Sequence, residues 1–348
     1  MSDKVRAALA SVVEGKRLSM DEARAAMGSV MDGEATPAQL AALLVSLRMR
    51  GETVEELAGF ATAMRERVLR VEAPEGAVDT CGTGGDGSNT FNISTAAALV
   101  VAAAGVPVAK HGNRAITSAC GSADVLEALG IATDLDPEEA GKALRTHCFA
   151  FLFAQTYHPA MKHAGPTRRE IGVRTAFNLL GPITNPAGAR RQVVGVGDPA
   201  AAPKLAEVLR LLGTEHALVV HGKGVDELPL DGSGVLYDVT PAGVTRHEVV
   251  AAELGLEPAT VEALAGGTRE ENAALIEAVL GGRNGPRRDV VLLNAAAAFL
   301  AAGRVPDLKA GIGVATETIA SGAATDLLAR LRAAKTARDA ARMEVAPA

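Results

Sequence analysis

The chain has 348 residues, 48% of them hydrophobic, which is enough for one large domain and a smaller one. Its net charge of -6 argues against a nucleic-acid-binding surface, and its three widely spaced cysteines, Cys81, Cys120 and Cys148, argue against a disulfide framework or a zinc site. We expect a reduced cytoplasmic setting and no membrane partner, because the sequence begins without a signal peptide and the apolar run 96–109 is too short to span a bilayer.

The first 70 residues predict helices only. Ser19 and Glu22 have the spacing of a capping box, Thr36 precedes a proline that can open the next helix, and Thr53 and Glu56 repeat the capping-box spacing. An apolar stripe at helical spacing follows each start. No residue here has a catalytic pattern, so we predict a small all-helical domain over 1–70 that serves in packing or dimerisation.

The pattern changes after Pro74, where short apolar runs alternate with helical segments. We predict strands at 77–80, 106–109, 149–154, 192–196 and 217–220, and helices at 95–104, 123–129 and 200–212, with a further helix start at Asp136. This alternation predicts an α/β domain over 75–348, with a mostly parallel sheet flanked by helices. Ligands of such sheets bind beyond the carboxyl ends of the strands, so chemistry is expected in the loops that follow them.

The first of these loops, residues 79–95, is rich in glycine and hydroxyl groups. Gly82, Gly84, Gly85 and Gly87 allow a ligand to approach the backbone, and polar side chains stand at the start of the next helix, where phosphate oxygens find donors. The spacing of residues 82–87 also matches the dinucleotide fingerprint. That fingerprint requires an acid about 20 residues later, and none occurs between residues 87 and 123, so we reject it.

The second loop, residues 110–118, follows the next predicted strand and carries Lys110, His111 and Arg114 within the same acid-free segment. Cations, glycines and hydroxyl groups without acids suit a polyanion. Two adjacent loops of this kind indicate a ligand with phosphates at two places.

An acidic pair, Asp226-Glu227, lies in a glycine-rich turn after the predicted strand 217–220. Magnesium binds one or two carboxylates together with ligand phosphates, so this pair beside two phosphate loops predicts a magnesium site. The ion would neutralise charge on a departing pyrophosphate.

At these residues the chain closely resembles the anthranilate phosphoribosyltransferases. The matching motifs occur in the family's order over nearly the whole chain: 81–86, 92–95, 110–114, 121–125, 158–161, 168–182 and 225–228. The resemblance implies a nucleoside phosphorylase-like fold in which about 160–185 joins the helical domain. It also implies homodimers, two magnesium ions per subunit, and transfer of the phosphoribosyl group of phosphoribosyl pyrophosphate to anthranilate, a step of tryptophan biosynthesis.

The resemblance also implies roles for individual residues. Those expected to bind phosphoribosyl pyrophosphate are Gly82, Gly85, Asp86, Thr90, Asn92, Ile93, Ser94, Thr95, Lys110, His111, Gly112, Asn113, Arg114, Ser118 and Ser122. Those expected to contact anthranilate are Gly82, Asn113 and Arg168, with His111, Tyr157 and His158 nearby, and those expected to bind magnesium are Ser94, Asp226 and Glu227.

Two alternative functions remain open at this point. A pyrimidine nucleoside phosphorylase of the same fold needs only one phosphate site and no metal pair, which disfavours it. A non-catalytic nucleic-acid-binding relative should carry a basic stripe, which the net charge disfavours. The expected reaction depends on positioning and electrostatics, and the sequence identifies no general base for the amine proton.

Overall fold

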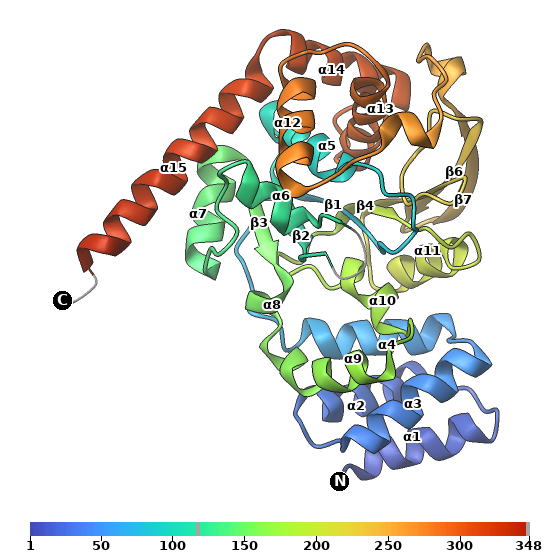
Figure 1. The fold of residues 1–348 in the computed structure, drawn as a ribbon. Helices are drawn as coiled ribbons and strands as arrows, with labels where there is room; N and C mark the ends of the chain where they lie inside the picture. Colours follow the sequence, from blue (N-terminus) through green and yellow to red (C-terminus); the bar gives the residue numbers. More distant parts are fainter. Residues whose placement is uncertain (116–118, 346–348) are drawn as a thin grey trace.

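The computed structural model describes residues 1–115 and 119–345. The amino-terminal part is a bundle of four helices, shown in blue in Figure 1: α1 (Asp3–Val13), α2 (Met20–Met31), α3 (Pro37–Arg50) and α4 (Val54–Arg65). The predicted capping boxes are confirmed, since the Glu22 backbone N–H donates to Ser19 Oγ over 3.3 Å and the Glu56 backbone N–H donates to Thr53 Oγ1 over 3.2 Å. Glu56 is fully buried and also accepts the backbone N–H of Leu18 at 2.8 Å, which ties the α1–α2 loop to α4.

The larger part contains one seven-stranded sheet in the order β3-β2-β1-β4-β5-β6-β7. Its strands are β1 (Val78–Gly82), β2 (Val108–Gly112), β3 (Phe149–Phe153), β4 (Arg191–Gly195), β5 (His216–Gly222), β6 (Ser233–Thr240) and β7 (Gly243–Val250). The five predicted strands are parallel neighbours, as expected. The antiparallel hairpin β6–β7 was not predicted. β7 forms the sheet edge and is largely exposed, so it lacks the apolar run that marks the buried strands.

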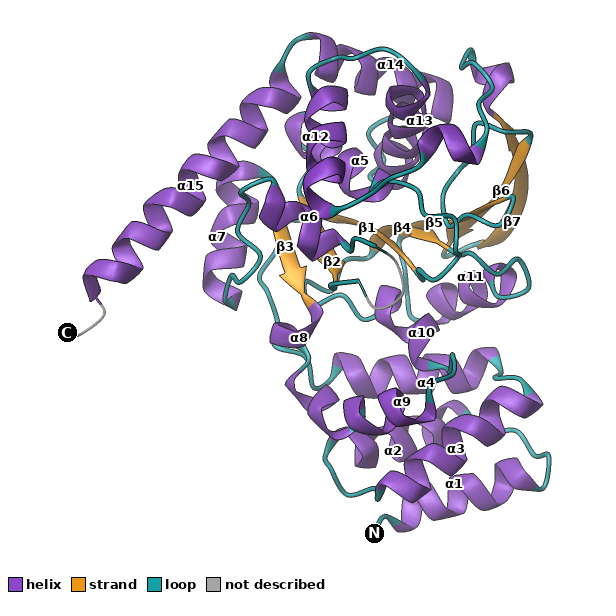
Figure 2. Cartoon of the chain, in the orientation of Figure 1, coloured by secondary structure: helices purple, strands orange, loops and turns teal. Residues whose placement is uncertain are grey.

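Helices cover both faces of the sheet (Figure 2). Consecutive strand residues face opposite sides, so Val193 and Leu218 join the core under α5 (Ile93–Ala103) and α13 (Pro286–Ala301). Val194 and Val219 belong to a second core, which is formed with α11 (Ala202–Leu211) and continues into the helical bundle. The larger part also contains α6 (Ser122–Ala128), α7 (Pro137–His147), α12 (Arg269–Leu280), α14 (Leu308–Ala320) and α15 (Ala323–Val345), with the 3-10 turns η3 (Ala251–Leu254) and η4 (Val261–Leu264).

A segment of short helices after β3 connects the two parts. It consists of α8 (Ala154–Tyr157), η1 (Pro159–His163), α9 (Gly165–Ile171), α10 (Phe177–Leu180) and η2 (Gly181–Ile183). In this segment η1 packs on α2, α9 on α3 and α10 on α4, while η2 contacts β2. The bundle is therefore held beside the carboxyl ends of the strands.

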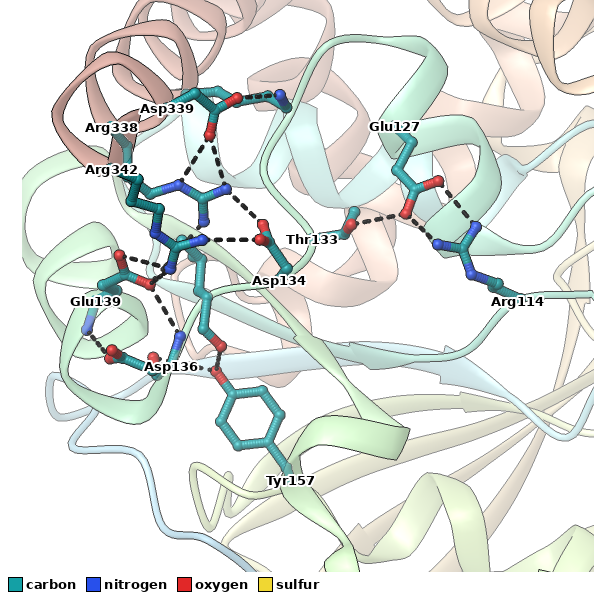
Figure 3. A network of polar contacts seen from close by, with 12 residues as sticks. Arg114, Glu127, Thr133, Asp134, Asp136, Glu139, Tyr157, Arg338, Asp339 and Arg342 are labelled. Atoms are coloured by element: carbon teal, nitrogen blue, oxygen red, sulfur yellow. Dashed lines mark hydrogen bonds and ion pairs between the residues drawn. The ribbon is translucent and has the colours of Figure 1, made fainter. Parts of the chain in front are cut away.

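The last helix, α15, packs its first turns against α5 and then extends away from the α/β core (Figure 1). Its carboxyl-terminal part is held by a network of ion pairs with the α6–α7 connection and α7 (Figure 3). Arg342 contacts Asp134 and Glu139, each at 2.9 Å, and Arg338 also pairs with Asp134. Partly exposed pairs of this kind contribute little individually, so the network fixes the direction of the helix more than the stability of the fold. Within residues 1–115 and 119–345, none of the helices combines the length and apolar character needed to cross a membrane.

Candidate functional site

Three carboxylates meet at the carboxyl edge of the sheet. Asp226 and Glu227 lie in the turn after β5, as predicted, and Asp86 reaches them from the glycine-rich loop after β1, with one oxygen of each residue within 4.8 Å of the others. The backbone N–H of Gly84 donates to Asp226 Oδ2 at 2.9 Å, and the backbone N–H of Asp226 lies 3.3 Å from Asp86 Oδ2. Asn294 of α13 holds the acidic turn through both polar groups of the Leu228 backbone.

Two glycines make room for this turn. Gly82 ends β1 and Gly195 ends β4, and the two are paired neighbours in the sheet. A Cβ atom on Gly82 would lie 2.3 Å from Asp226 Oδ2, and one on Gly195 would lie 1.6 Å from the carbonyl oxygen of Asp226. Any side chain at either position would displace the acidic turn.

The electrostatics of the three acids suit a divalent cation. Burial raises the pKa of Asp226, and the neighbouring Asp86 raises it further. Burial, Asp226 and Asp86 together raise the pKa of Glu227 well above its usual range. The Oε2 atom of Glu227 is buried without a hydrogen-bond partner among the described residues. A hard cation such as magnesium takes oxygen ligands. Bound here, it would contact Glu227 Oε2 and offset the repulsion between the three carboxylates, so the residues fit magnesium.

Lys110 lies beside this cluster, on a strand rather than in a loop. The sequence placed the end of the strand at Ala109, but β2 continues through Gly112, so Lys110, His111 and Gly112 belong to the sheet. Lys110 is 2% exposed and its ammonium donates to the Thr80 carbonyl and, at 3.3 Å, to Ser94 Oγ. Burial lowers its pKa, while Asp79 has the opposite effect. A buried cation held by neutral groups suits a phosphate ligand.

The start of α5 carries the other predicted phosphate ligands of the first loop. Ser94 is half-buried and Thr95 is buried, with Thr95 Oγ1 lacking a partner among the described residues, while Ile93 is a core residue whose backbone opens the helix. The Asn92 amide is already occupied, because it donates to the Cys120 carbonyl at 3.1 Å and accepts from Asn272 at 3.0 Å. Sequence reasoning missed Asn272, which comes from a distant helix.

The glycine loop is braced on its outer side. Arg174 donates to the carbonyl oxygens of Gly84 and Gly85 at 2.9 and 3.0 Å. Thr90, half-buried, forms an isolated bridge with Ala265. A cavity of about 360 Å³ lies between this loop, the α3–α4 connection and the start of α11. Arg174 thus orients the peptide groups of the glycine loop through their carbonyl oxygens and does not occupy their N–H groups.

The second loop is only partly in a phosphate-binding arrangement. Gly112, Asn113 and Ser122 meet there, with Ser122 Oγ 3.4 Å from the Asn113 carbonyl oxygen. Arg114 is engaged elsewhere: it pairs with Glu127 at 2.6 Å and Asp124 at 3.1 Å, as Figure 3 shows for Glu127. Its use as a phosphate ligand would require it to leave these acids. Ser118, another predicted ligand, lies outside the described residues.

Arg168 and Arg169 differ in their surroundings, as the helical spacing predicts. Arg168 on α9 is half-buried and its guanidinium lies 4.8 Å from the centre of the Phe177 ring. Burial lowers the pKa of Arg168, and no side-chain hydrogen bond or ion pair joins it to the residues of 1–115 and 119–345. Arg169 is exposed. Arg168 is thus a partly desolvated cation within the connecting segment, without an acidic partner among the described residues.

Three other residues named at the sequence level lie around the same segment. His111 and His158 face each other with their Nε2 atoms 3.2 Å apart, and His111 Nδ1 is 3.1 Å from the Gly181 carbonyl oxygen. The Tyr157 hydroxyl is committed elsewhere, because it donates to the Leu135 carbonyl at 2.8 Å (Figure 3). Among the described residues, those predicted for the two substrates lie at or after the ends of β1 and β2, at the starts of α5 and α6, and on the connecting segment.

Comparison with known proteins gives matches over both parts of the chain. Residues 74–325 match the model described as the α/β domain of the glycosyl transferase family, and residues 6–68 match the helical bundle domain of that family. Two similar relatives are anthranilate phosphoribosyltransferases from Symbiobacterium thermophilum, 56% identical, and from a Roseiflexus species, 53% identical. Each match covers 94% of this chain and 97% of the relative.

Solved structures agree in fold and family. The anthranilate phosphoribosyltransferase of Thermus thermophilus superimposes with a TM-score of 0.90 at 48% identity, covering 94% of this chain and 99% of that one. The enzyme of Saccharomyces cerevisiae, solved in complex with phosphoribosyl pyrophosphate and magnesium, gives a TM-score of 0.88 at 26% identity, covering 97% of this chain and 99% of that one. The chain belongs to the anthranilate phosphoribosyltransferase family of glycosyl transferases.

Proposed function

We propose that this chain joins the amine nitrogen of anthranilate to the ribosyl carbon of phosphoribosyl pyrophosphate and releases pyrophosphate. The observation that carries the proposal is the juxtaposition of the Asp86, Asp226 and Glu227 carboxylates with buried Lys110 and two glycine-bearing strand ends. The carboxylates suit a bound cation and Lys110 suits phosphate oxygens, so the site as a whole suits a polyanionic substrate that carries a metal ion. Family membership supplies the identity of the two substrates.

The first loop and the end of β2 would hold phosphoribosyl pyrophosphate. We assign to it the phosphate-binding residues that the sequence predicts, with Lys110 as the main buried positive charge. Arg168 would bind the anthranilate carboxylate, because a half-buried guanidinium that has no partner within 1–115 and 119–345 can form a two-point contact with it. Gly82 and Asn113 would border the same molecule.

Two magnesium ions per subunit complete the proposed site. Asp226, Glu227 and Ser94 would bind them, directly or through water, and we propose Asp86 as a further oxygen donor because its carboxylate lies within 4.8 Å of those of Asp226 and Glu227. When bound, magnesium would supply positive charge that offsets the negative charge of the departing pyrophosphate. The protein's own residues hold the acceptor in line with that carbon and keep the phosphates in place.

We further propose that two copies of the chain pair through the helical domain, composed of 1–70 and about 160–185. The bundle exposes large apolar side chains that contribute nothing to its own core: Val13 on α1 is 67% exposed, and on α3 Val45 is 37% and Met49 84% exposed. Val45 and Met49 lie one turn apart, so they form one apolar stripe. Light scattering should show a dimer, and Met49→Glu should shift it toward monomer.

The reaction is tested by following the loss of anthranilate fluorescence. Turnover should require phosphoribosyl pyrophosphate and magnesium together, and pyrophosphate should appear in a one-to-one ratio with consumed anthranilate. Phosphorolysis of a pyrimidine nucleoside without anthranilate turnover would overturn the proposal. We place the enzyme in the cytoplasm, where its three free cysteines would stay reduced.

A further inference from the structure

The hydrogen-bond ladder between β1 and β2 is interrupted at the edge of the sheet where the site lies. The two strands pair at one position, Val78 opposite Val108, whereas β1 pairs with β4 and β2 with β3 along five residues each. In a regular parallel ladder the next rung would join Thr80 to the Ala109 carbonyl and the His111 N–H. In this structure side chains take the place of that rung.

Asp79 of β1 and Asn185, which lies between η2 and β4, supply the replacement. Asp79 accepts the His111 backbone N–H at Oδ1 over 3.1 Å, and its Oδ2 accepts the Asn185 amide at 2.7 Å. The same amide nitrogen donates to the Ala109 carbonyl at 2.8 Å, while Asn185 Oδ1 accepts the Ala187 N–H at 2.8 Å. That last contact fixes which end of the amide faces the acid, because only its nitrogen can donate. Asp79 is 0% and Asn185 4% exposed, so water does not compete for these contacts.

The two side chains engage the carbonyl before Lys110 and the N–H after it, and so hold β2 on both sides of this residue. Because the His111 N–H is bonded to Asp79, it does not compete for the Thr80 carbonyl. That carbonyl accepts the Lys110 ammonium instead, and the ammonium also donates to Ser94 Oγ at 3.3 Å, at the start of α5. The interrupted ladder therefore gives the ammonium a backbone acceptor in the gap between the strands.

The charges around the gap favour the same arrangement. Burial lowers the pKa of the Lys110 ammonium, and Asp79 opposes that effect more than Glu227 or Asp226 does. Burial raises the pKa of Asp79 to about 6, so this group is mainly a carboxylate at neutral pH. Asp79 is not one of the proposed metal ligands. Its charge therefore stays available to the ammonium when a cation neutralises the other two acids.

We propose that Asp79 and Asn185 are positioning residues, which place the Lys110 ammonium for a phosphate group of phosphoribosyl pyrophosphate. This inference rests on the proposed function, because Lys110 is assigned there to that substrate. Both residues act through Lys110 and the peptide groups that flank it. Without them the strands would close into a regular rung, and the Thr80 carbonyl would accept a backbone N–H in place of the ammonium.

The test compares Asp79→Asn with Glu56→Gln, a control that makes the same acid-to-amide change. Glu56 is also fully buried and accepts a backbone N–H, that of Leu18, but it lies in the helical bundle. An asparagine at position 79 has one oxygen for two donors, so one of the two contacts is lost. Calorimetric titration with phosphoribosyl pyrophosphate and magnesium should give a Kd about tenfold higher for Asp79→Asn, as expected for one weakened charged hydrogen bond, and an unchanged Kd for Glu56→Gln. The KM for anthranilate should stay the same in both variants.

A double-mutant cycle with Lys110→Ala separates positioning from general damage to the site. If Asp79 acts through Lys110, Asp79→Asn should change the Kd by less than about twofold once the ammonium is absent. If Asp79→Asn fails to fold, Asn185→Leu, which has nearly the same size but no amide donor, replaces it in the cycle.

Three outcomes would overturn the inference while leaving the proposed function intact. These are a wild-type Kd for phosphoribosyl pyrophosphate in the single variant, the same loss of affinity with and without Lys110, and an equal rise in the KM for anthranilate. A wild-type protein that neither binds phosphoribosyl pyrophosphate nor consumes anthranilate would instead refute the proposed function.

Discussion

Removing the Arg168 guanidinium should weaken the use of anthranilate and leave the use of phosphoribosyl pyrophosphate almost unchanged. The side chain is half-buried over the Phe177 ring and no described residue neutralises it, so its charge is available to the anthranilate carboxylate. A charged hydrogen-bonded contact of this kind contributes roughly 1.5–3 kcal/mol, which corresponds to about 10- to 150-fold in affinity. We therefore expect Arg168→Ala to raise the anthranilate KM by a factor in that range.

The matched control is Arg169→Ala, since Arg169 follows on the same helix but is exposed. Initial rates would be measured against each substrate in turn, and again with aniline, which has no carboxylate. Aniline should be a poor acceptor for the wild type and no worse for Arg168→Ala. Equal impairment by the two substitutions, or a tenfold loss of aniline use in Arg168→Ala, would refute the carboxylate contact.

Four further predictions concern the phosphate and metal side of the site. Replacing Asp226 and Glu227 together by Asn and Gln should nearly abolish turnover, and calorimetry should show that substrate binding no longer depends on magnesium. The thermal midpoint should stay level or rise, because the variant lacks two buried acids with raised pKa values. Lys110→Ala should raise the KM for phosphoribosyl pyrophosphate by roughly 10- to 150-fold but not that for anthranilate; equal affinity in a titration would contradict its role. Gly82→Ala should reduce kcat, because its Cβ would stand 2.3 Å from Asp226 Oδ2, whereas Gly313→Ala, where nothing lies within 4 Å, should be silent. Burial raises the pKa of Asp79 from 3.8 to about 6. The folded state therefore holds the carboxyl proton more tightly than the unfolded state, and the free energy of unfolding should fall by about 3 kcal/mol as pH rises through that interval. Denaturant titrations of Asp79→Asn should lack that decrease.

Sequence patterns predicted the parts of the fold that depend on local rules. Capping boxes at Ser19 and Thr53 are visible because the partner residue is always three positions away, and buried parallel strands appear as short apolar runs. The hairpin β6–β7 escaped prediction because an exposed edge strand carries polar residues that resemble a loop. The end of β2 was placed too early, since Lys110 looks like a loop residue until its burial is known.

In the candidate site too, residues close together in sequence could be predicted, whereas residues brought together by the fold could not. Asp226 and Glu227 are adjacent in sequence and glycines surround them, so the pair could be found by inspection. Asp86 joins them only because β1 and β5 flank β4, and its 140-residue separation from Asp226 leaves no local signal. The partners that brace the site, Arg174, Asn272 and Asn294, are likewise distant in sequence. The His111 ring is likewise held by the Gly181 carbonyl, a backbone group that no side-chain pattern reveals.

The paired glycines at the ends of β1 and β4 have a consequence for how this enzyme can change over time. Gly82 and Gly195 contribute no functional group, yet the acidic turn occupies the space that their side chains would need. The surface of α9 around Arg168, by contrast, does not contact this turn, so we expect single side chains there to tolerate replacement better. At Gly82 and Gly195 even the smallest replacement, alanine, places a Cβ atom inside the space of the acidic turn. In a saturation library, Gly195 in particular should tolerate no replacement, although it carries out no chemistry.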